Sequence, residues 1–279
     1  MNLPPPELTD LPGGRVAFRR CGSGPAILCL HGLGGGSKSW SRQFEDLSSE
    51  FTVVAWDAPG YGGSDRRAPR LDAYAEAAVA LIEVLGIAPV TLVGHSMGGV
   101  VAARLAAIRP GLVTRLVLSC TFWGEARAED APLVEGYAQR LVDHAHLSVE
   151  AFGRARARGM TGPNVDPDIF DEVAGIASEI RGDGFADTCH VLNHADNRAI
   201  LPALRMPVLV LSAEHDSVVR NDRIEPLAAL LPGCVRAIVT GAGHAPYLED
   251  AGQYDRILRE FVNTTATPVP GQPIGSSVS

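Results

Sequence analysis

A serine lies between glycines in the segment Gly94–Gly98, which reads Gly-His-Ser-Met-Gly. A G-x-S-x-G pattern presents its serine on a sharp turn when a strand precedes it and a helix follows it. Here the apolar run Val90–Val93 precedes the pattern, and a segment of helical composition, Ser96–Ile108, follows it. We therefore predict that Ser96 is a nucleophile, and that the helix N-terminus beside it favours negative charge.

Such a serine needs a base, and two later segments offer polar groups at the right places. One segment follows the apolar run Val208–Leu211 and contains both Glu214 and Asp216. The other follows the run Val235–Thr240 and contains His244. Parallel strands end at one edge of a sheet, so these groups should meet the serine there. We predict His244 as general base. Glu214 and Asp216 compete for the role of the acid that orients it, and a solvated loop residue is the favoured interpretation of Glu214.

Two backbone N–H groups would complete a site for acyl transfer by stabilising an oxyanion. One donor is the residue after the nucleophile, Met97, and the other lies in the loop after an earlier strand. That strand is predicted at Ala26–Leu30 and is followed by the glycine-rich loop His31–Gly36. We predict Leu33 as the second donor, with Gly34 as the alternative. The loop lacks the Gly-Lys-Ser/Thr ending of a phosphate-binding loop.

Short apolar runs alternate with amphipathic segments along the chain. The runs are Ala26–Leu30, Phe51–Trp56, Val90–Val93, Leu116–Ser119, Val208–Leu211 and Val235–Thr240. Strands without polar alternation suit a parallel sheet that is covered on both faces. Helical segments follow these runs. They include Tyr74–Leu85, which Gly86 should end, and Gly252–Val262 after the last run. The pattern predicts an α/β fold with a doubly wound, mostly parallel sheet.

The stretch 123–204 interrupts this alternation, because it contains no convincing apolar strand and has a helical composition. We predict that it is a helical cap inserted between strands of a core formed by residues 1–122 and 205–265. The segment 266–279 is rich in Pro, Gly and Ser and is predicted to be disordered. Trp123, at the start of the insertion, is a candidate for lining an acyl pocket, although an aromatic residue in such a place is packing at least as often.

Composition narrows the classes of partner. The 279 residues carry a net charge of −8 without a run of Lys or Arg, which disfavours nucleic acid or an anionic membrane and leaves a small-molecule substrate. Five scattered cysteines argue against a disulfide framework or zinc site, and Met1–Asp10 does not have the pattern of a signal peptide. We expect a cytoplasmic protein without a membrane span, cofactor or metal. The sequence leaves the oligomeric state open.

Taken together, the motifs resemble the α/β-hydrolase fold superfamily as far as Val262. The matching pieces are HGLGGG at His31–Gly36, DAPGYGGSD at Asp57–Asp65, GHSMGG at Gly94–Gly99, Asp216 in SAEHDSVV, and GHAPYLED at Gly243–Asp250. The resemblance implies that Ser96, Asp216 and His244 are nucleophile, acid and base, and that the helical insertion covers the active site. The stretch Ile200–Asp216 and the compact cap are similar to enol-lactone hydrolases and related esterases.

The resemblance implies a serine hydrolase that cleaves a carboxylic ester or lactone through an acyl-enzyme on Ser96. Related enzymes that cleave carbon–carbon bonds of vinylogous diketones carry Asn and Trp where this chain has His95 and Ala245. This difference favours the ester or lactone. A carbon–carbon hydrolase stays as an alternative, because one of the cap residues Arg154, Arg156 or Arg158 could stabilise the charge of its intermediate. Further alternatives are a ligand receptor with slow turnover and a metal-free perhydrolase with the same three residues.

Overall fold

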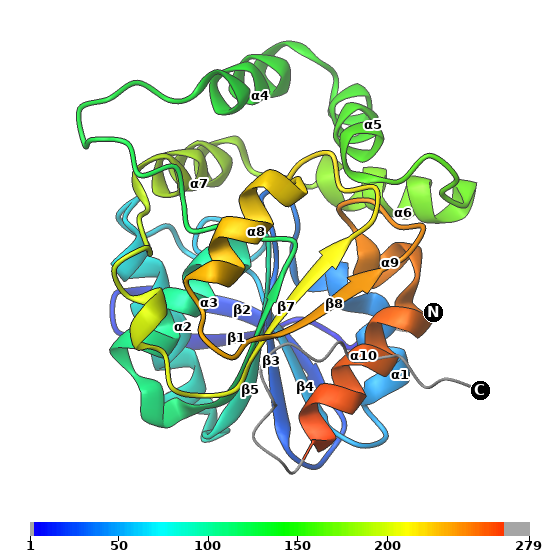
Figure 1. Cartoon of the computed structure of the whole chain (residues 1–279). Coiled ribbons are helices and arrows are strands. Elements are labelled where there is room, and N and C mark those ends of the chain that lie inside the picture. The colour runs from blue at the N-terminus through cyan, green and yellow to red at the C-terminus, as the bar shows by residue number, and fades with distance from the viewer. Residues whose placement is uncertain (1–2, 265–279) are drawn as a thin grey trace.

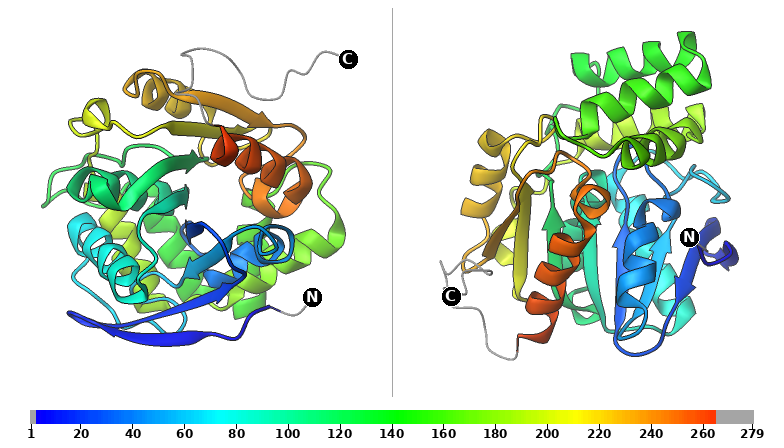
Figure 2. Two further views of the ribbon diagram at one scale, coloured as in Figure 1. Left: turned by 90° about the horizontal axis from the view of Figure 1, so that it is seen from below. Right: turned by 90° about the vertical axis from the view of Figure 1, so that its right-hand side faces the viewer.

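The computed structural model describes residues 3–264, which form one eight-stranded sheet with helices on both faces (Figures 1 and 2). The strand order is β1-β2-β4-β3-β5-β6-β7-β8. Strands β3 to β8 are mutually parallel, whereas β2 runs antiparallel to both of its neighbours. The predicted α/β fold with a mostly parallel sheet is therefore confirmed.

The bounds of the elements agree with most of the predicted ones. The strands are β1 (Glu7–Leu11), β2 (Gly14–Cys21), β3 (Ala26–Leu30), β4 (Thr52–Trp56), β5 (Val90–His95), β6 (Val113–Ser119), β7 (Val208–Ala213) and β8 (Val235–Val239). The α-helices outside the stretch 123–204 are α1 (Ser41–Leu47), α2 (Leu71–Leu85), α3 (Met97–Ile108), α8 (Asn221–Ala229), α9 (Pro246–Glu249) and α10 (Ala251–Asn263). Gly86 ends α2 with φ of 62°, a left-handed conformation that glycine adopts without strain.

Two differences from the predicted elements have clear causes. The hairpin of β1 and β2 is not predicted from apolar runs, because each strand mixes charged and apolar residues near the edge of the sheet. The sequence Pro12-Gly13-Gly14 between these strands is a turn signal that could have indicated it. Strand β6 starts three residues earlier than predicted, because Thr114 and Arg115 interrupt its apolar run while its pairing with β5 continues.

Side chains of the central strands alternate between two apolar layers. On β3, Leu28 and Leu30 belong to the layer that contains residues of α2 and α3. Ile27 and Cys29 belong to the layer that contains residues of α1, α9 and α10. All five residues of β3 are buried, as expected for a parallel strand covered on both faces. This double cover fixes the position of the strand ends from which functional side chains project.

Four helices connect β6 to β7, and we call them the cap. They are α4 (Glu135–His146), α5 (Val149–Met160), α6 (Pro167–Ser178) and α7 (Gly182–His194). Figure 1 shows them together at the top of the molecule, beyond the ends of the strands. The described part of the stretch 123–204 contains no strand, in agreement with its helical composition. The predicted disordered tail, 266–279, lies outside the described residues.

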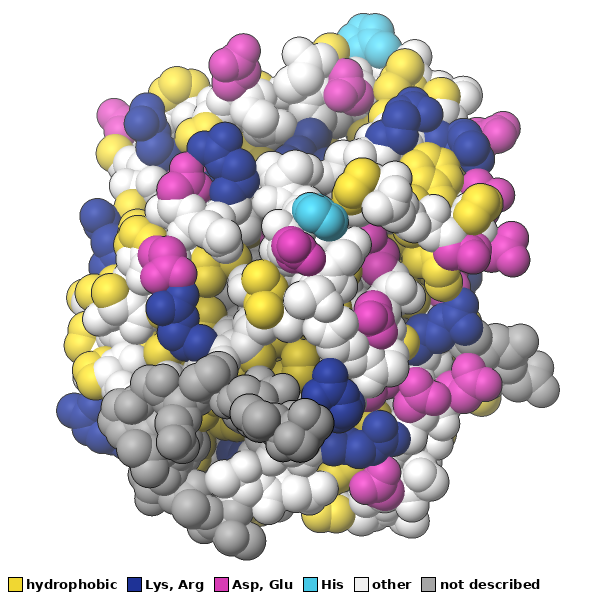
Figure 3. All heavy atoms as spheres, turned by 45° about the vertical axis from the view of Figure 1, so that its right-hand side comes forward, with side chains coloured by type: hydrophobic (Ala, Val, Ile, Leu, Met, Phe, Trp, Pro, Cys, Tyr) yellow, Lys and Arg dark blue, Asp and Glu magenta, His cyan; other side chains and the backbone are white. Residues whose placement is uncertain are grey.

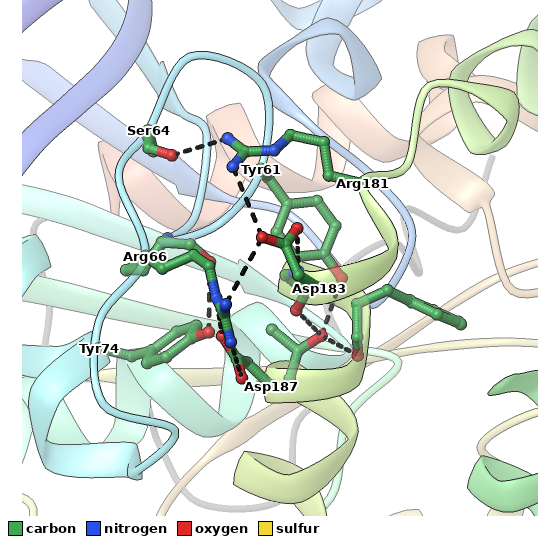
Figure 4. Close-up of polar contacts among 11 residues, drawn as sticks. Tyr61, Ser64, Arg66, Tyr74, Arg181, Asp183 and Asp187 are labelled. Atoms are coloured by element: carbon green, nitrogen blue, oxygen red, sulfur yellow. Dashed lines mark hydrogen bonds and ion pairs between the residues drawn. The ribbon is translucent and has the colours of Figure 1, made fainter.

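A polar network joins α7 of the cap to the loop after β4 (Figure 4). Arg66 donates two hydrogen bonds to the carboxylate of Asp187, at 2.7 and 2.9 Å. Arg181 donates to the carbonyl oxygen of Ser64 at 3.1 Å, and the hydroxyls of Tyr61 and Thr188 are 2.9 Å apart. These contacts fix the cap relative to the sheet on this side.

The surface is of mixed charge on the face that Figure 3 shows, where acidic and basic side chains are interspersed.

Within residues 3–264 no helix is both long and apolar enough to cross a membrane.

Candidate active site

Ser96 occupies the sharp turn that the sequence predicts between β5 and α3. Its backbone has φ of 52° and ψ of −117°, and its N–H donates to Ser119 O at 2.9 Å. The hydroxyl of Thr121 donates to Ser96 O at 2.6 Å and helps to hold this strained conformation. A Cβ atom on Gly98 would lie 2.0 Å from Leu30 O, so glycine is required there for the turn to pack against β3.

A buried chain of hydrogen bonds connects Ser96, His244 and Asp216. His244 Nε2 lies 3.0 Å from Ser96 Oγ, and His244 Nδ1 lies 2.8 Å from Asp216 Oδ2. A carboxylate only accepts hydrogen bonds, so Nδ1 carries the proton and Nε2 is free to accept one from the serine. The three residues come from the ends of β5, β7 and β8 and meet as the sequence predicts.

Asp216 is held as an anion by its surroundings. Burial by itself raises the pKa of this carboxyl, but the charge and hydrogen bond of His244 and two backbone N–H groups outweigh burial and lower the pKa. Those N–H groups belong to Val218 and Val219, and each donates to Asp216 Oδ1 at 2.8 Å. Asp216 therefore stays ionised at neutral pH and fixes the orientation of the His244 ring.

Glu214, the competing carboxylate, is exposed and lies outside this chain of hydrogen bonds. It accepts a hydrogen bond from the N–H of Gly241 at 2.8 Å. Of the two carboxylates that the sequence leaves in competition, Asp216 is the one that contacts His244.

The loop of His244 is also bonded to the cap, through a residue that the sequence reasoning missed. Glu249 accepts hydrogen bonds from the N–H groups of Gly243 at 3.0 Å and Ala245 at 3.2 Å, and from the cap residue Gly162 at 2.6 Å. The N–H of His244 itself donates to Met160 O at 2.6 Å. The position of the histidine is therefore linked to the end of α5.

The two predicted oxyanion donors are placed beside the serine. Leu33 and Ser96 line the same cavity, and Met97 is the first residue of α3, where an N–H has no acceptor within its own helix. No protein acceptor for the N–H of Leu33 or Met97 occurs within the described part of the chain. The Leu33 loop is fixed by His31, whose Nε2 accepts from Ala58 N–H at 2.9 Å. Within the described residues, both N–H groups are thus without a protein acceptor.

A cavity of about 290 Å³ lies between this hydrogen-bonded chain and the cap. Phe122 lines it, whereas the predicted Trp123 does not line it and packs against the apolar layer that contains α2 and α3. Of the two interpretations of Trp123, pocket lining and packing, the structure therefore shows packing. Of the three candidate cap arginines, only Arg156 lines the cavity.

One group of side chains, within residues 3–264, has the spacing of metal ligands: Cys120, Asp216 and His244. Two of the atoms that would bind a metal, His244 Nδ1 and Asp216 Oδ2, are already hydrogen-bonded to each other. Burial and the Asp216 carboxylate raise the pKa of the Cys120 thiol well above its usual value, which disfavours the thiolate that a metal needs. The donor set fits proton transfer along the chain of hydrogen bonds better than metal binding.

A family model for the alpha/beta hydrolase fold matches residues 25–251. The chain belongs to this family. The matched range contains the turn of Ser96, the loop of Asp216 and the loop of His244, so the buried chain of hydrogen bonds lies within the family's shared core.

Relatives of this α/β hydrolase include esterases. The pimeloyl-acyl-carrier-protein methyl ester esterase of Chromobacterium violaceum is 29% identical over 257 residues, which are 88% of this chain and 97% of the relative. The enol-lactonase from Burkholderia xenovorans LB400 is 23% identical with a TM-score of 0.82 and covers 92% of this chain and 100% of its own. A thermophilic esterase from Thermogutta terrifontis is 25% identical with a TM-score of 0.80, covering 92% and 98%. The family and the esterase relatives support a hydrolase activity, and the enol-lactonase shares the fold.

Proposed function

We propose that this α/β hydrolase cleaves a carboxylic ester or lactone of a small molecule through an acyl-enzyme on Ser96. The observation that carries the proposal is the buried chain from Ser96 Oγ through His244 to Asp216, with distances of 3.0 and 2.8 Å. A cavity of about 290 Å³ next to the serine suits a small substrate.

In this mechanism His244 Nε2 takes the proton of Ser96 as the hydroxyl oxygen attacks the substrate carbonyl. The N–H groups of Leu33 and Met97 stabilise the oxyanion, and Asp216 stabilises the imidazolium that forms. His244 then donates its proton to the departing alkoxide, which leaves an acyl group on Ser96. Water that His244 activates attacks this acyl group, releases the carboxylic acid and restores the serine.

The ester or lactone is favoured over a carbon–carbon bond by the residues beside the reacting groups. His95 lies next to the His244 ring, with the two ring centres 4.7 Å apart. Burial and the neighbouring histidines lower the pKa of His95 well below its usual value, so this ring is neutral and offers no positive charge. An alkoxide leaving group needs only a proton from His244, whereas a carbanion-like group needs further stabilisation. The esterase relatives point the same way. Arg156 lines the cavity and is a candidate for that stabilisation, so the carbon–carbon alternative is separated by the comparison of substrates below.

Two measurements test the proposal. A serine-directed phosphonate should label Ser96, and Ser96→Ala should lose on the order of 10⁴- to 10⁶-fold in kcat while staying folded by circular dichroism. Ser217→Ala, which changes an exposed serine beside Asp216, is the matched control and should keep its activity.

The wild-type enzyme is also compared on three substrates: a ring-cleavage diketone, an ester matched to it, and an enol-lactone. It should hydrolyse the ester and the enol-lactone faster than the diketone. Retention of more than roughly a tenth of the activity in Ser96→Ala would exclude this nucleophile. A preference of about tenfold for the diketone would exclude the proposed bond type.

A further inference from the structure

The cavity above Ser96 has a strongly uneven distribution of charge. Three arginines line it, Arg140 of α4, Arg156 of α5 and Arg223 of α8, together with a single carboxylate, Glu125. The whole chain carries a net charge of −8, so this concentration of positive charge is local to the site.

Glu125 neutralises only one of these arginines. Its carboxylate accepts two hydrogen bonds from Arg223, at 2.9 and 3.0 Å, and a third from the hydroxyl of Tyr137 at 3.2 Å. The guanidinium of Arg223 also lies over the ring of Phe122 at 4.0 Å. Arg223 and Glu125 thus form a satisfied pair in the wall of the cavity.

Arg140 and Arg156 form no ion pair in the part of the chain that the structure describes, and neither hydrogen-bonds to Glu125, the carboxylate in the cavity wall. Arg140 lies over the ring of Tyr137, with 5.6 Å from its guanidinium carbon to the ring centre. Arg156 makes one weak hydrogen bond, to the sulfur of Met160 at 3.8 Å, and its enclosed Nε has no acceptor among residues 3–264. An enclosed guanidinium without a partner is costly, because desolvation is not repaid by hydrogen bonds.

The environment of Arg156 disfavours its charge but does not remove it. Burial, and then the neighbouring charge of Arg140, lower the pKa of Arg156 to about 10. The guanidinium is therefore still protonated at neutral pH, and an anion placed beside it would regain the lost interaction energy. The charge of Asp143 acts on Arg156 in the opposite direction and raises its pKa, but it does not outweigh burial.

Arg156 is also close to the reacting groups. Its Nε lies 3.9 Å from the position that a Cβ atom would occupy on Gly34, the residue after the proposed oxyanion donor Leu33. Both arginines share one cavity with Ser96 and His244. A molecule bound to the serine by its carbonyl would therefore extend to the guanidinium groups within a cavity of about 290 Å³.

We propose that Arg140 and Arg156 bind a carboxylate on the substrate, so that the enzyme acts on short esters or lactones that carry a second, ionised carboxyl group. A planar guanidinium pairs with a carboxylate through two parallel hydrogen bonds, and two such groups side by side suit one anionic end of a ligand. This inference rests on the proposed function of Ser96 and names the substrate class of the same site.

The test compares charged and neutral substrates of nearly equal size. Initial rates of hydrolysis are measured for the monomethyl and dimethyl esters of succinate, glutarate and adipate. The half-ester should be preferred in kcat/KM by on the order of 10- to 100-fold, the range expected for hydrogen bonds to a charged group. Arg156→Gln and Arg140→Gln should each lower kcat/KM for the half-ester at least tenfold more than for the diester, mainly by raising KM for the half-ester.

Arg158→Gln is the matched control, because Arg158 lies on the same helix but is exposed and outside the cavity. It should leave both substrates unchanged. Equal wild-type rates on half-ester and diester, or equal losses on both in Arg156→Gln, would overturn the inference while leaving Ser96 as nucleophile. Failure of phosphonate to label Ser96, together with no hydrolysis of the neutral esters, would instead overturn the proposed function.

Binding gives a readout that does not need turnover. Monomethyl glutarate should bind Ser96→Ala in a calorimetric titration, and the Ser96→Ala/Arg156→Gln double variant should bind it at least tenfold more weakly. Inorganic phosphate is titrated in parallel. No binding of the half-ester, or tighter binding of phosphate than of the half-ester, would overturn the assignment of a carboxylate.

Discussion

We call the side of the cavity next to the sheet its lower wall and the side next to the cap its upper wall. The two walls differ in whether their polar groups have hydrogen-bond or ion-pair partners. In the lower wall, Ser96, His244 and Asp216 form a closed chain in which each reacting group has its partner. In the upper wall, Arg140 and Arg156 of the cap form no ion pair within residues 3–264. Under the proposed function this difference is a division of roles, in which the sheet pre-organises the chemistry and the cap leaves positive charge for a ligand.

The two walls also contribute different groups to the cavity. The lower wall contributes Ser96 and His244, which project from the ends of strands that apolar layers cover on both faces. The cap contributes Arg140 and Arg156, and it is held on the sheet by polar contacts, such as Arg66 with Asp187, and by apolar side chains, such as Phe185, that belong to the same layers. Under the proposed function, changes in the lower wall should remove the reaction itself, and changes at the cap arginines should alter binding.

The largest expected effect comes from the acid of the lower wall. Asp216→Asn should lower kcat by up to about 10⁴-fold, because an amide does not stabilise the imidazolium and favours the wrong tautomer of His244. Glu214→Gln, two residues away, is the control and should stay within about threefold, since Glu214 contacts only the backbone of Gly241. Steady-state kinetics on one ester measure both. Equal losses in the two variants would contradict the assignment of the acid.

A smaller expected effect tests whether other buried polar groups of the core also have all their hydrogen-bond partners, as Ser96, His244 and Asp216 do. Asp255, on α10, is fully buried; its Oδ1 accepts from Gln43 at 3.0 Å, but its Oδ2 has no partner among the described residues. Burial raises the pKa of this carboxyl to about 7. The folded state therefore holds a proton that the unfolded chain releases near pH 4, and stability falls as the pH rises from about 4 to 7.

Asp255→Asn removes this loss of stability. Between pH 5 and pH 8 the variant should gain about 1–3 kcal/mol relative to wild type in urea unfolding. Asp216→Asn should show no such gain, since the pKa of Asp216 is lowered rather than raised. A difference between wild type and Asp255→Asn that does not change with pH would show that the Asp255 carboxyl is ionised in the folded protein.

The smallest expected effect concerns the attachment of the cap. Arg66→Ala removes both hydrogen bonds to Asp187 and should let α7 move away from the loop after β4. We expect KM for a small ester to rise about two- to fivefold with kcat nearly unchanged, and the cap to be cut faster in limited proteolysis. Arg198→Ala, which removes an exposed pair with Asp196, is the control. A fall in kcat larger than the rise in KM would show that α7 also positions the reacting groups.

Sequence alone was sufficient to place the proposed nucleophile and base at the ends of strands, because each follows a locally recognisable strand. A strand, a turn and a helix are decided over about 20 residues, and parallel strands bring their carboxyl ends to one edge whatever lies between them. Ser96, Asp216 and His244 could therefore be named and expected to meet. The choice of Asp216 over Glu214, by contrast, rested on resemblance and required the contact with His244 to be seen.

The cavity wall was decided by tertiary structure. Residues Arg154, Arg156 and Arg158 are equivalent in composition, but successive residues of a helix are turned by about 100°, so the packing of α5 decides which of them faces the serine. Arg154 pairs with Asp171 at the surface, Arg158 is exposed, and Arg156 alone lines the cavity. Arg140 and Glu249 escaped sequence reasoning for the same reason, because their partners lie on elements distant in the chain. Local pattern determines which groups sit at the ends of strands, whereas only long-range packing determines which face of a cap helix meets them.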